Sequence, residues 1–292
     1  MTHFKTPIGL LTLPALLFVL ILFIVPAATL FSYSVLTQTP DGRIFLPFTL
    51  ANYAHLFTTP VYYSVLLATL RVSGATAALS VLLGFPVALA IVRGGPIVSR
   101  ATMIILVAPL VVSIVVRTYG WQLLLANSGT GVVNWALHAR GFGPAPVRVL
   151  YSETAVVIGS LHVFLPMLVL PLSSAIARIQ PAVEEAARTL GAPAWRVFCR
   201  VTLPLSLPGL IAGVTIVFSL TSASYVTPAI LGGNRGQMLG NLLEQQVVTV
   251  YNWPLSAAIA VVMVALSLAV SLAVVRLLDH PMRRLRRAAE LA

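Results

Sequence analysis

One polar stretch, which lies between long apolar runs, contains the residues whose types and spacing point most directly to a function. The stretch runs E-A-A from Glu185, then Gly191 after three residues, then Val201-Thr202-Leu203-Pro204 after nine more. Pro181 fits a first helical turn, acidic side chains suit the positive end of a helix dipole, and Gly191 provides a stop. Small side chains at 186 and 187 let another protein approach closely. The predicted chemistry is protein docking by a short helix, and the alternative is an ordinary amphipathic loop.

The candidate docking residues are Glu184, Glu185, Ala186, Ala187, Arg188, Leu190 and Gly191, with Leu203 and Pro204 at the end of the loop. A second helix is expected after Pro193. Leu203-Pro204 and Pro208-Gly209 should end it.

Arg71 and Arg117 lie within apolar runs, where a charge costs about 2.5 to 3.5 kcal/mol in lipid. They are expected to face the interior of a helix bundle. One interpretation is a pathway residue that attracts an anionic group of a solute. The other is a structural arginine that bonds backbone carbonyls or reaches the membrane boundary.

Further pathway candidates are aromatic or hydroxylated residues: Tyr119, Trp121, Ser222, Ser224, Tyr225 and Thr227. Hydroxyls of this kind also bond neighbouring helices, so a packing role stays open. His162 is expected to be a packed, neutral histidine, and Gly209 and Gly213 have the spacing of a close helix contact.

Several kinds of chemistry are excluded. The seven acidic residues lie outside the centres of the apolar runs, and we find no metal cluster or hydrolytic triad. Lys5 is the only lysine, so a phosphate-binding loop of the G-x-x-x-x-G-K-[ST] type cannot form. The single cysteine, Cys199, excludes an intramolecular disulfide. We expect no catalytic residue, no metal and no cofactor on this chain.

The elements that must position these residues are membrane helices. The 292 residues are 59% hydrophobic and 9% charged, which identifies an integral membrane protein. Continuous apolar runs favour helices over a barrel. We predict an all-α protein with one transmembrane domain over 1–292, an intervening loop at 178–209, and six spans near 10–33, 64–92, 101–125, 154–177, 210–231 and 254–278. Prolines within the runs, Pro109 among them, should kink the helices.

The net charge of +11 follows membrane topology and does not indicate nucleic acid. With the N-terminus inside, twelve of the 18 basic residues are cytoplasmic: Lys5, Arg93, Arg100, Arg178, Arg188, Arg196, Arg200, Arg276, Arg283, Arg284, Arg286 and Arg287. Both termini and the E-A-A stretch are therefore predicted to face the cytoplasm.

The spacing of the E-A-A stretch resembles the cytoplasmic EAA loop of bacterial ABC importer permeases. Other segments look like the polyamine (spermidine/putrescine) branch, in its PotB-like first-permease half: Arg117-Thr118-Tyr119-Gly120-Trp121, Asn127-Ser128-Gly129-Thr130-Gly131, 165–172, 227–233 and Asn252-Trp253-Pro254-Leu255. Gln180-Pro181 departs from the acidic residue that many relatives carry before the proline.

The resemblance implies a type I ABC importer permease fold in the bacterial inner membrane, with 184–191 as the coupling helix. It also implies a second homologous permease subunit, two nucleotide-binding ATPase subunits that use ATP and Mg²⁺, and an extracytoplasmic substrate-binding protein. A polyamine is the favoured solute. Because no carboxylate lies within the spans, an amine-bearing anion (an opine, amino acid or aminophosphonate) stays open, as does, more remotely, an ion-coupled secondary carrier.

Overall fold

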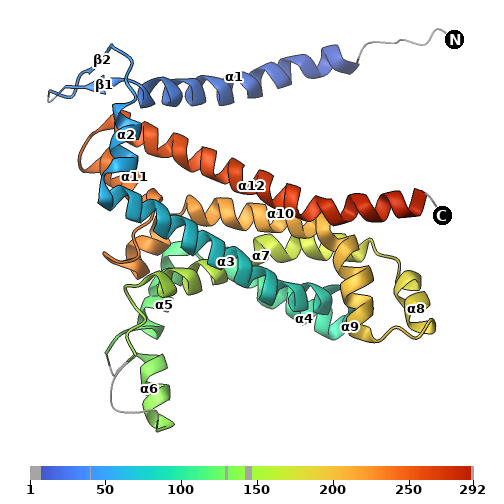
Figure 1. Ribbon diagram of the computed structural model, residues 1–292. Coiled ribbons are helices and arrows are strands. Elements are labelled where there is room, and N and C mark those ends of the chain that lie inside the picture. The colour runs from blue at the N-terminus through green and yellow to red at the C-terminus, as the bar shows by residue number, and fades with distance from the viewer. Residues whose placement is uncertain (1–7, 40, 129–130, 142–146, 291–292) are drawn as a thin grey trace. The chain divides into compact units, whose positions relative to one another are not determined.

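The computed structural model describes residues 8–39, 41–128, 131–141 and 147–290 (Figure 1). Backbone contacts divide the chain into two compact units, Met1–Tyr62 with Leu243–Val262, and Tyr63–Leu242 with Met263–Ala292. Within these described ranges, five helices are long and apolar enough to cross a membrane, and a sixth span is present if one bent helix pair counts as a span. The assignment of 1–292 to one transmembrane domain stays a prediction.

The first unit contains α1 (Ile8–Ser34), a two-stranded hairpin and α2 (Ala51–Thr58). In the hairpin, β1 (Thr37–Gln38) pairs antiparallel with β2 (Ile44–Phe45). Gln38 fixes the hairpin to the segment before α12, because its Nε2 donates to the Tyr251 carbonyl at 2.8 Å and its Oε1 accepts from the Trp253 backbone N–H at 3.0 Å.

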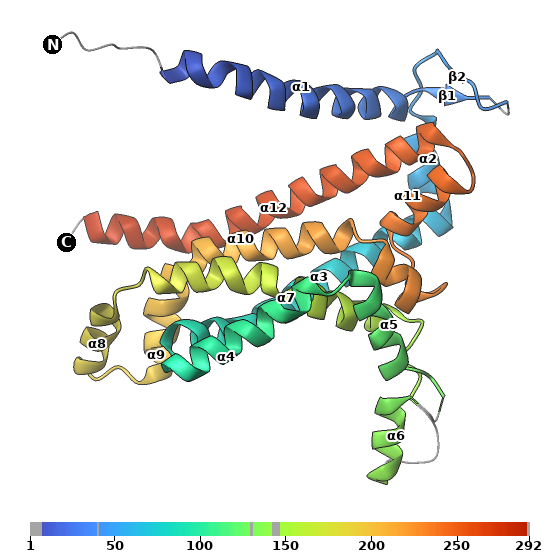
Figure 2. The ribbon, with the colours of Figure 1, turned by 180° about the vertical axis from the view of Figure 1, so that it is seen from behind.

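The second unit holds most of the spans. Its helices are α3 (Pro60–Arg93), whose first three residues belong to the first unit, α4 (Pro96–Val107), α5 (Ile114–Leu124), α6 (Val132–Ala139), α7 (Glu153–Ala177), α8 (Pro181–Thr189), α9 (Ala194–Val197) and α10 (Leu203–Ser222). The helices α11 (Leu239–Val248) and α12 (Trp253–Glu290) run through the boundary between the units. Within the second unit, α8 and α9 lie at one end, and α5 and α6 lie at the other (Figures 1 and 2).

The core of this unit forms around α7. Leu168, Leu172 and Ile176 on α7 are fully buried against residues of α3 and α10. Glycines allow the close approach: a Cβ at Gly84 of α3 would lie 2.6 Å from Leu168, and one at Gly213 of α10 would lie 3.0 Å from the Leu168 backbone. The G-x-x-x-G spacing noted in the sequence therefore lies directly against α7.

The predicted span at 101–125 is not one straight helix. The helix α4 passes into a 3₁₀ turn, η1 (Ala108–Val111), and α5 then leaves at 104° to the first part. Pro109 lies inside η1, and Val112 and Ser113 have extended ψ angles of 137° and 139°. A proline removes one helical hydrogen bond, and the extended residues that follow change the chain direction. The expected kink at Pro109 is thus a sharp bend.

The predicted boundaries near 210–231 are wrong at both ends. The loop does not continue to Gly209, because the π-helical segment η2 (Phe198–Thr202) joins α9 to α10. Leu203 and Pro204 form the first turn of α10 and do not end the preceding helix. Proline is tolerated there because a first-turn N–H has no intrahelical partner. At the other end, α10 stops at Ser222, and a second π-helical segment, η3 (Pro228–Gly232), follows after a break.

Candidate functional site

The polar stretch folds as the predicted helix, turn and second helix. Pro181 lies in the first turn of α8, and Gly191 follows its end with φ of 82°. The Gly191 N–H donates to the Arg188 carbonyl at 2.9 Å, and the Ala192 N–H donates to the Ala187 carbonyl at 3.1 Å. These two bonds form a Schellman motif, which requires a left-handed residue where glycine is favoured. The E-A-A segment is therefore a helix with a defined end.

Glu184 points into the molecule and anchors α8. Its carboxylate accepts a hydrogen bond from Thr202 Oγ1 at 2.9 Å and forms an ion pair with Arg93 Nε at 3.3 Å. Arg93 also donates from Nη2 to the Ile179 carbonyl at 2.9 Å. Because Arg93 ends α3 and Thr202 precedes α10, this network ties α8 to two spans. Glu184, a predicted docking residue, is buried, and its contacts position α8; a direct docking contact of its own stays a prediction.

The outer face of α8 is accessible. Glu185, Ala186 and Arg188 are exposed, and so are Leu190 (89%) and Trp195 (65%). Apolar side chains of this size at the tip of a protruding turn are typical of a surface that another protein covers. Beside this face, a cavity of about 640 Å³ is lined by the C-terminal end of α7, the start of α8 and the first turns of α10.

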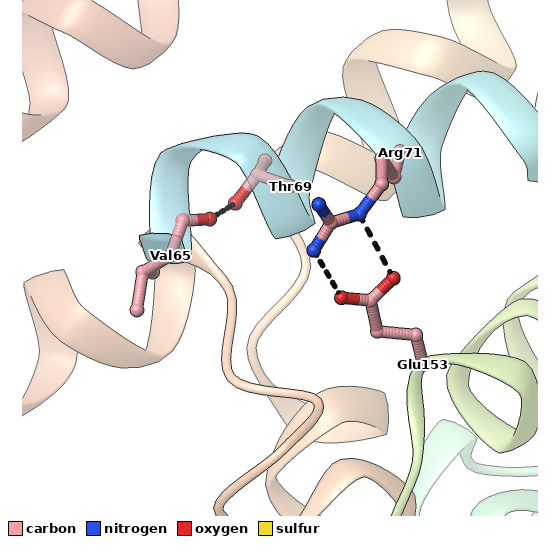
Figure 3. Close-up of polar contacts among 4 residues, drawn as sticks. All are labelled: Val65, Thr69, Arg71 and Glu153. Atoms are coloured by element: carbon pink, nitrogen blue, oxygen red, sulfur yellow. Dashed lines mark hydrogen bonds and ion pairs between the residues drawn. The ribbon is translucent and has the colours of Figure 1, made fainter. Parts of the chain in front are cut away.

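Arg71 forms an ion pair with Glu153 at the first turn of α7 (Figure 3). Its Nη2 lies 2.6 Å from Oε1 and its Nε lies 3.2 Å from Oε2, so the pairing is bidentate. The Arg71 side chain is 60% exposed in this chain, and the expectation that it faces the interior of a helix bundle stays a prediction. The pairing was not visible in the sequence because 82 residues separate the partners.

Arg117 lies on α5 with a different environment. Its Nε and Nη1 atoms are buried and have no hydrogen-bond partner within the described part of the chain. Nearby on α5, Trp121 donates from Nε1 to Nδ1 of His162 at 3.0 Å, and the two rings meet edge to face. His162 is thus a hydrogen-bonded histidine that links α7 to α5.

The remaining pathway candidates are dispersed. Ser222 is buried and lies 3.3 Å from the Ser267 hydroxyl, whereas Ser224 and Tyr225 lie in the break after α10. Thr227 is buried, and Tyr119 and Tyr225 are exposed. No side-chain hydrogen bond or ion pair joins any two of the eight pathway candidates, all of which the structure describes. Their grouping into one pathway stays a prediction.

The sequence did not predict four residues that contact the candidate site residues: Arg93, Thr202, Glu153 and His162. Periodicity shows which face of a helix a residue occupies, but it does not show which distant residue faces it. A usable signal existed only for Glu153, because an acidic residue at a predicted span end near an intramembrane arginine is a possible partner.

The fold is that of an ABC importer permease. A solved bacterial ABC transporter involved in the import of the acidic polysaccharide alginate has a chain that matches with a TM-score of 0.69 at 20% identity, over 94% of this chain and 95% of that one. The chain has the type I permease fold, all-α with several membrane helices.

The family model of the binding-protein-dependent transport system inner membrane component matches residues 80–284. The spermidine/putrescine transport system permease protein PotB of Haemophilus influenzae is 33% identical over 249 residues, covering 85% of this chain and 86% of the relative. PotB of Escherichia coli K12 is 30% identical over 243 residues, covering 83% and 87%.

The chain belongs to the family of binding-protein-dependent transport system inner membrane components. It is a transmembrane permease subunit of an ABC importer. It is not an enzyme, since in this family the ATPase is a separate chain.

Proposed function

We propose that this chain forms one half of the membrane pathway of a polyamine importer, with spermidine or putrescine as the solute. The observation that carries the proposal is the similarity to the two PotB permeases, whose names state this transport, over more than four fifths of the chain. A second, homologous permease subunit completes the pathway. An extracytoplasmic substrate-binding protein delivers the solute.

In this proposal α8 is the coupling helix, which docks on one of two nucleotide-binding subunits. Those subunits use ATP and Mg²⁺, and this chain binds neither. The exposed Ala186 of α8, Leu190 at its end and Trp195 of α9 support the docking role, because they give the α8–turn–α9 segment an apolar surface that a groove can cover. The anchoring of Glu184 to Arg93 supports it further, because a docked helix must be firmly joined to the spans that it moves.

The proposed topology places both termini and α8 in the cytoplasm. The distribution of arginines supports it, since basic residues concentrate in cytoplasmic segments. The opposite end of the second unit, with α5 and α6, then faces outward (Figure 2).

One observation favours a second candidate solute, an amine-bearing anion such as an aminophosphonate. Arg117 has two buried guanidinium nitrogens without a hydrogen-bond partner among the described residues, while Glu153 is already paired with Arg71. A cationic guanidinium in a membrane helix attracts an anionic group and repels an ammonium group.

Uptake by the complete transporter in proteoliposomes separates the two candidates. With the ATPase inside and the substrate-binding protein outside, we expect ATP-dependent accumulation of labelled spermidine, with competition by putrescine and none by 2-aminoethylphosphonate. Accumulation of the phosphonate and not of spermidine would refute the polyamine proposal. Arg117→Ala should then reduce phosphonate uptake and leave co-purification with the ATPase unchanged.

A further inference from the structure

An open hollow lies in the second unit, where the segment after α5 meets the start of α7 and the segment after η3. Its volume is about 520 Å³, within the range of roughly 300 to 1,000 Å³ that is usual for ligand pockets. The polar residues among those that line it are Asn127, Arg148, Tyr151, Ser152, Asn234 and Arg235.

The wall of this hollow is fixed by hydrogen bonds. Asn127 donates from Nδ2 to the Leu150 carbonyl and accepts from the Leu150 N–H, both at 3.0 Å. The Tyr151 N–H donates to the Leu231 carbonyl at 2.9 Å, which holds Tyr151 at a φ of 63°. A surface that is already ordered loses little conformational entropy when a partner binds it.

The charge of the hollow is uncompensated. Arg148 and Arg235 are exposed, and neither forms an ion pair or a side-chain hydrogen bond with any described residue. The residues that line the hollow, all of them described, include no carboxylate. The nearest acidic residue in the sequence, Glu153, is occupied by its bidentate pair with Arg71. Two guanidinium groups thus remain available to an external anion.

We propose that this hollow receives a carboxylate side chain of the extracytoplasmic substrate-binding protein. The inference rests on the proposed function, which places this end of the unit outside the membrane. Guanidinium groups bind carboxylates through paired, directional hydrogen bonds. A polyamine carries positive charge, so two free arginines repel the solute itself, whereas an acidic partner surface is attracted.

A protein partner fits the observations better than a small free anion. Exposed arginines bind a dissolved anion weakly, because water and salt screen the interaction. A protein that covers the hollow removes that water, and the same charges then contribute to orientation and to the rate of encounter.

The test uses the complete transporter in nanodiscs and the purified substrate-binding protein of the same system. We expect the double variant Arg148→Ala/Arg235→Ala to lower the association rate constant about tenfold at low salt and to flatten its dependence on ionic strength. The double Arg→Lys variant should retain most of the association rate, because it keeps both charges. Basal ATPase activity without the binding protein should be the same in all variants, which confirms assembly.

Arg140→Ala is the matched control, since Arg140 is exposed, lies like Arg148 between α5 and α7, and does not line the hollow. Association of the double alanine variant at the wild-type rate would overturn the proposal, as would an equal loss in Arg140→Ala. If the double alanine variant associates normally with the substrate-binding protein but takes up less of an anionic solute, the proposal is also overturned. The two arginines would then bind the solute itself. Wild-type spermidine uptake, measured in parallel, tests the proposed function separately, because binding-protein association does not require that solute.

Discussion

Removal of the Glu184 carboxylate should loosen α8 while the spans stay folded. The side chain accepts from Thr202 at 2.9 Å and pairs with Arg93 at 3.3 Å. A hydrogen bond to a charged group contributes about 1.5 to 3 kcal/mol, and loss of one partner of a fully buried pair costs about 3 to 5 kcal/mol. Here 11% of the Glu184 side chain and 27% of the Arg93 side chain are exposed, so water can solvate Arg93 after truncation.

The lower part of this range is therefore appropriate, and Glu184→Ala should cost α8 about 2 kcal/mol of local stability. Since about 1.4 kcal/mol is a factor of ten in an equilibrium constant, amide hydrogens of α8 should exchange about 30 times faster. Hydrogen exchange followed by mass spectrometry on the detergent-solubilised transporter measures this change directly. Peptides from α7 and α3 should show little change.

Glu185→Ala is the matched control, because Glu185 is the adjacent glutamate on the same helix and is exposed. Its exchange rates should change by about fivefold at most, the upper size of a helix-dipole effect at an exposed site. Arg93→Ala should resemble Glu184→Ala, and the double variant should show less than the sum of the two effects. Equal rates in Glu184→Ala and Glu185→Ala would refute the anchoring role.

Three further substitutions test other parts of the structure. Gly191→Asp should leave the chain inserted but abolish coupled uptake, whereas Gly191→Asn should be milder, because both side chains can adopt the φ of 82° that the turn requires but only aspartate adds a charge to the docking surface; normal uptake by the Asp variant would exclude the docking role of this turn. Gly209→Ala should lower the melting temperature in detergent, because the new Cβ would lie 2.5 Å from the Pro171 carbonyl oxygen; Gly74→Ala, which meets nothing within 4 Å, is the control, and equal melting temperatures would exclude close packing. Trp121→Phe removes the donor to His162 and should cost about 0.6 to 1 kcal/mol by thermal denaturation; no loss would show that the bond contributes nothing net.

Hydropathy predicted the membrane helices well because lipid imposes a length and a composition on each span. It could not locate the breaks. Pro109 signals a kink, yet the 104° bend depends on the extended conformation of Val112 and Ser113 as well, and a single serine within an apolar run does not show how far the chain turns. The end of α10 at Ser222 was also missed, because the hydropathy of the whole run outweighed Ser224, Thr227 and Pro228, which follow that end.

The local signals of the E-A-A stretch were more informative than those of the pathway. Pro181 and Gly191 act on their own neighbours, so a helix start and a helix stop can be read from the sequence. The role of an intramembrane arginine depends instead on what lies opposite. Arg71 has a carboxylate partner, whereas two nitrogens of Arg117 have no hydrogen-bond partner among the described residues. In the sequence the two arginines look alike, because each lies within an apolar run.

The two adjacent glutamates explain how one short helix can both dock and transmit motion. Consecutive helical residues point about 100° apart, so Glu184 reaches Arg93 and Thr202 while Glu185 stays on the open face. A helix that served only for packing would not expose Leu190. If α8 docks on the ATPase as proposed, a displacement of this helix is transmitted to α3 through Arg93 and to α10 through Thr202. Glu184→Ala should therefore keep the ATPase bound but move less solute for each ATP hydrolysed, and an unchanged ratio of uptake to hydrolysis would mean that the motion reaches the spans through the chain alone.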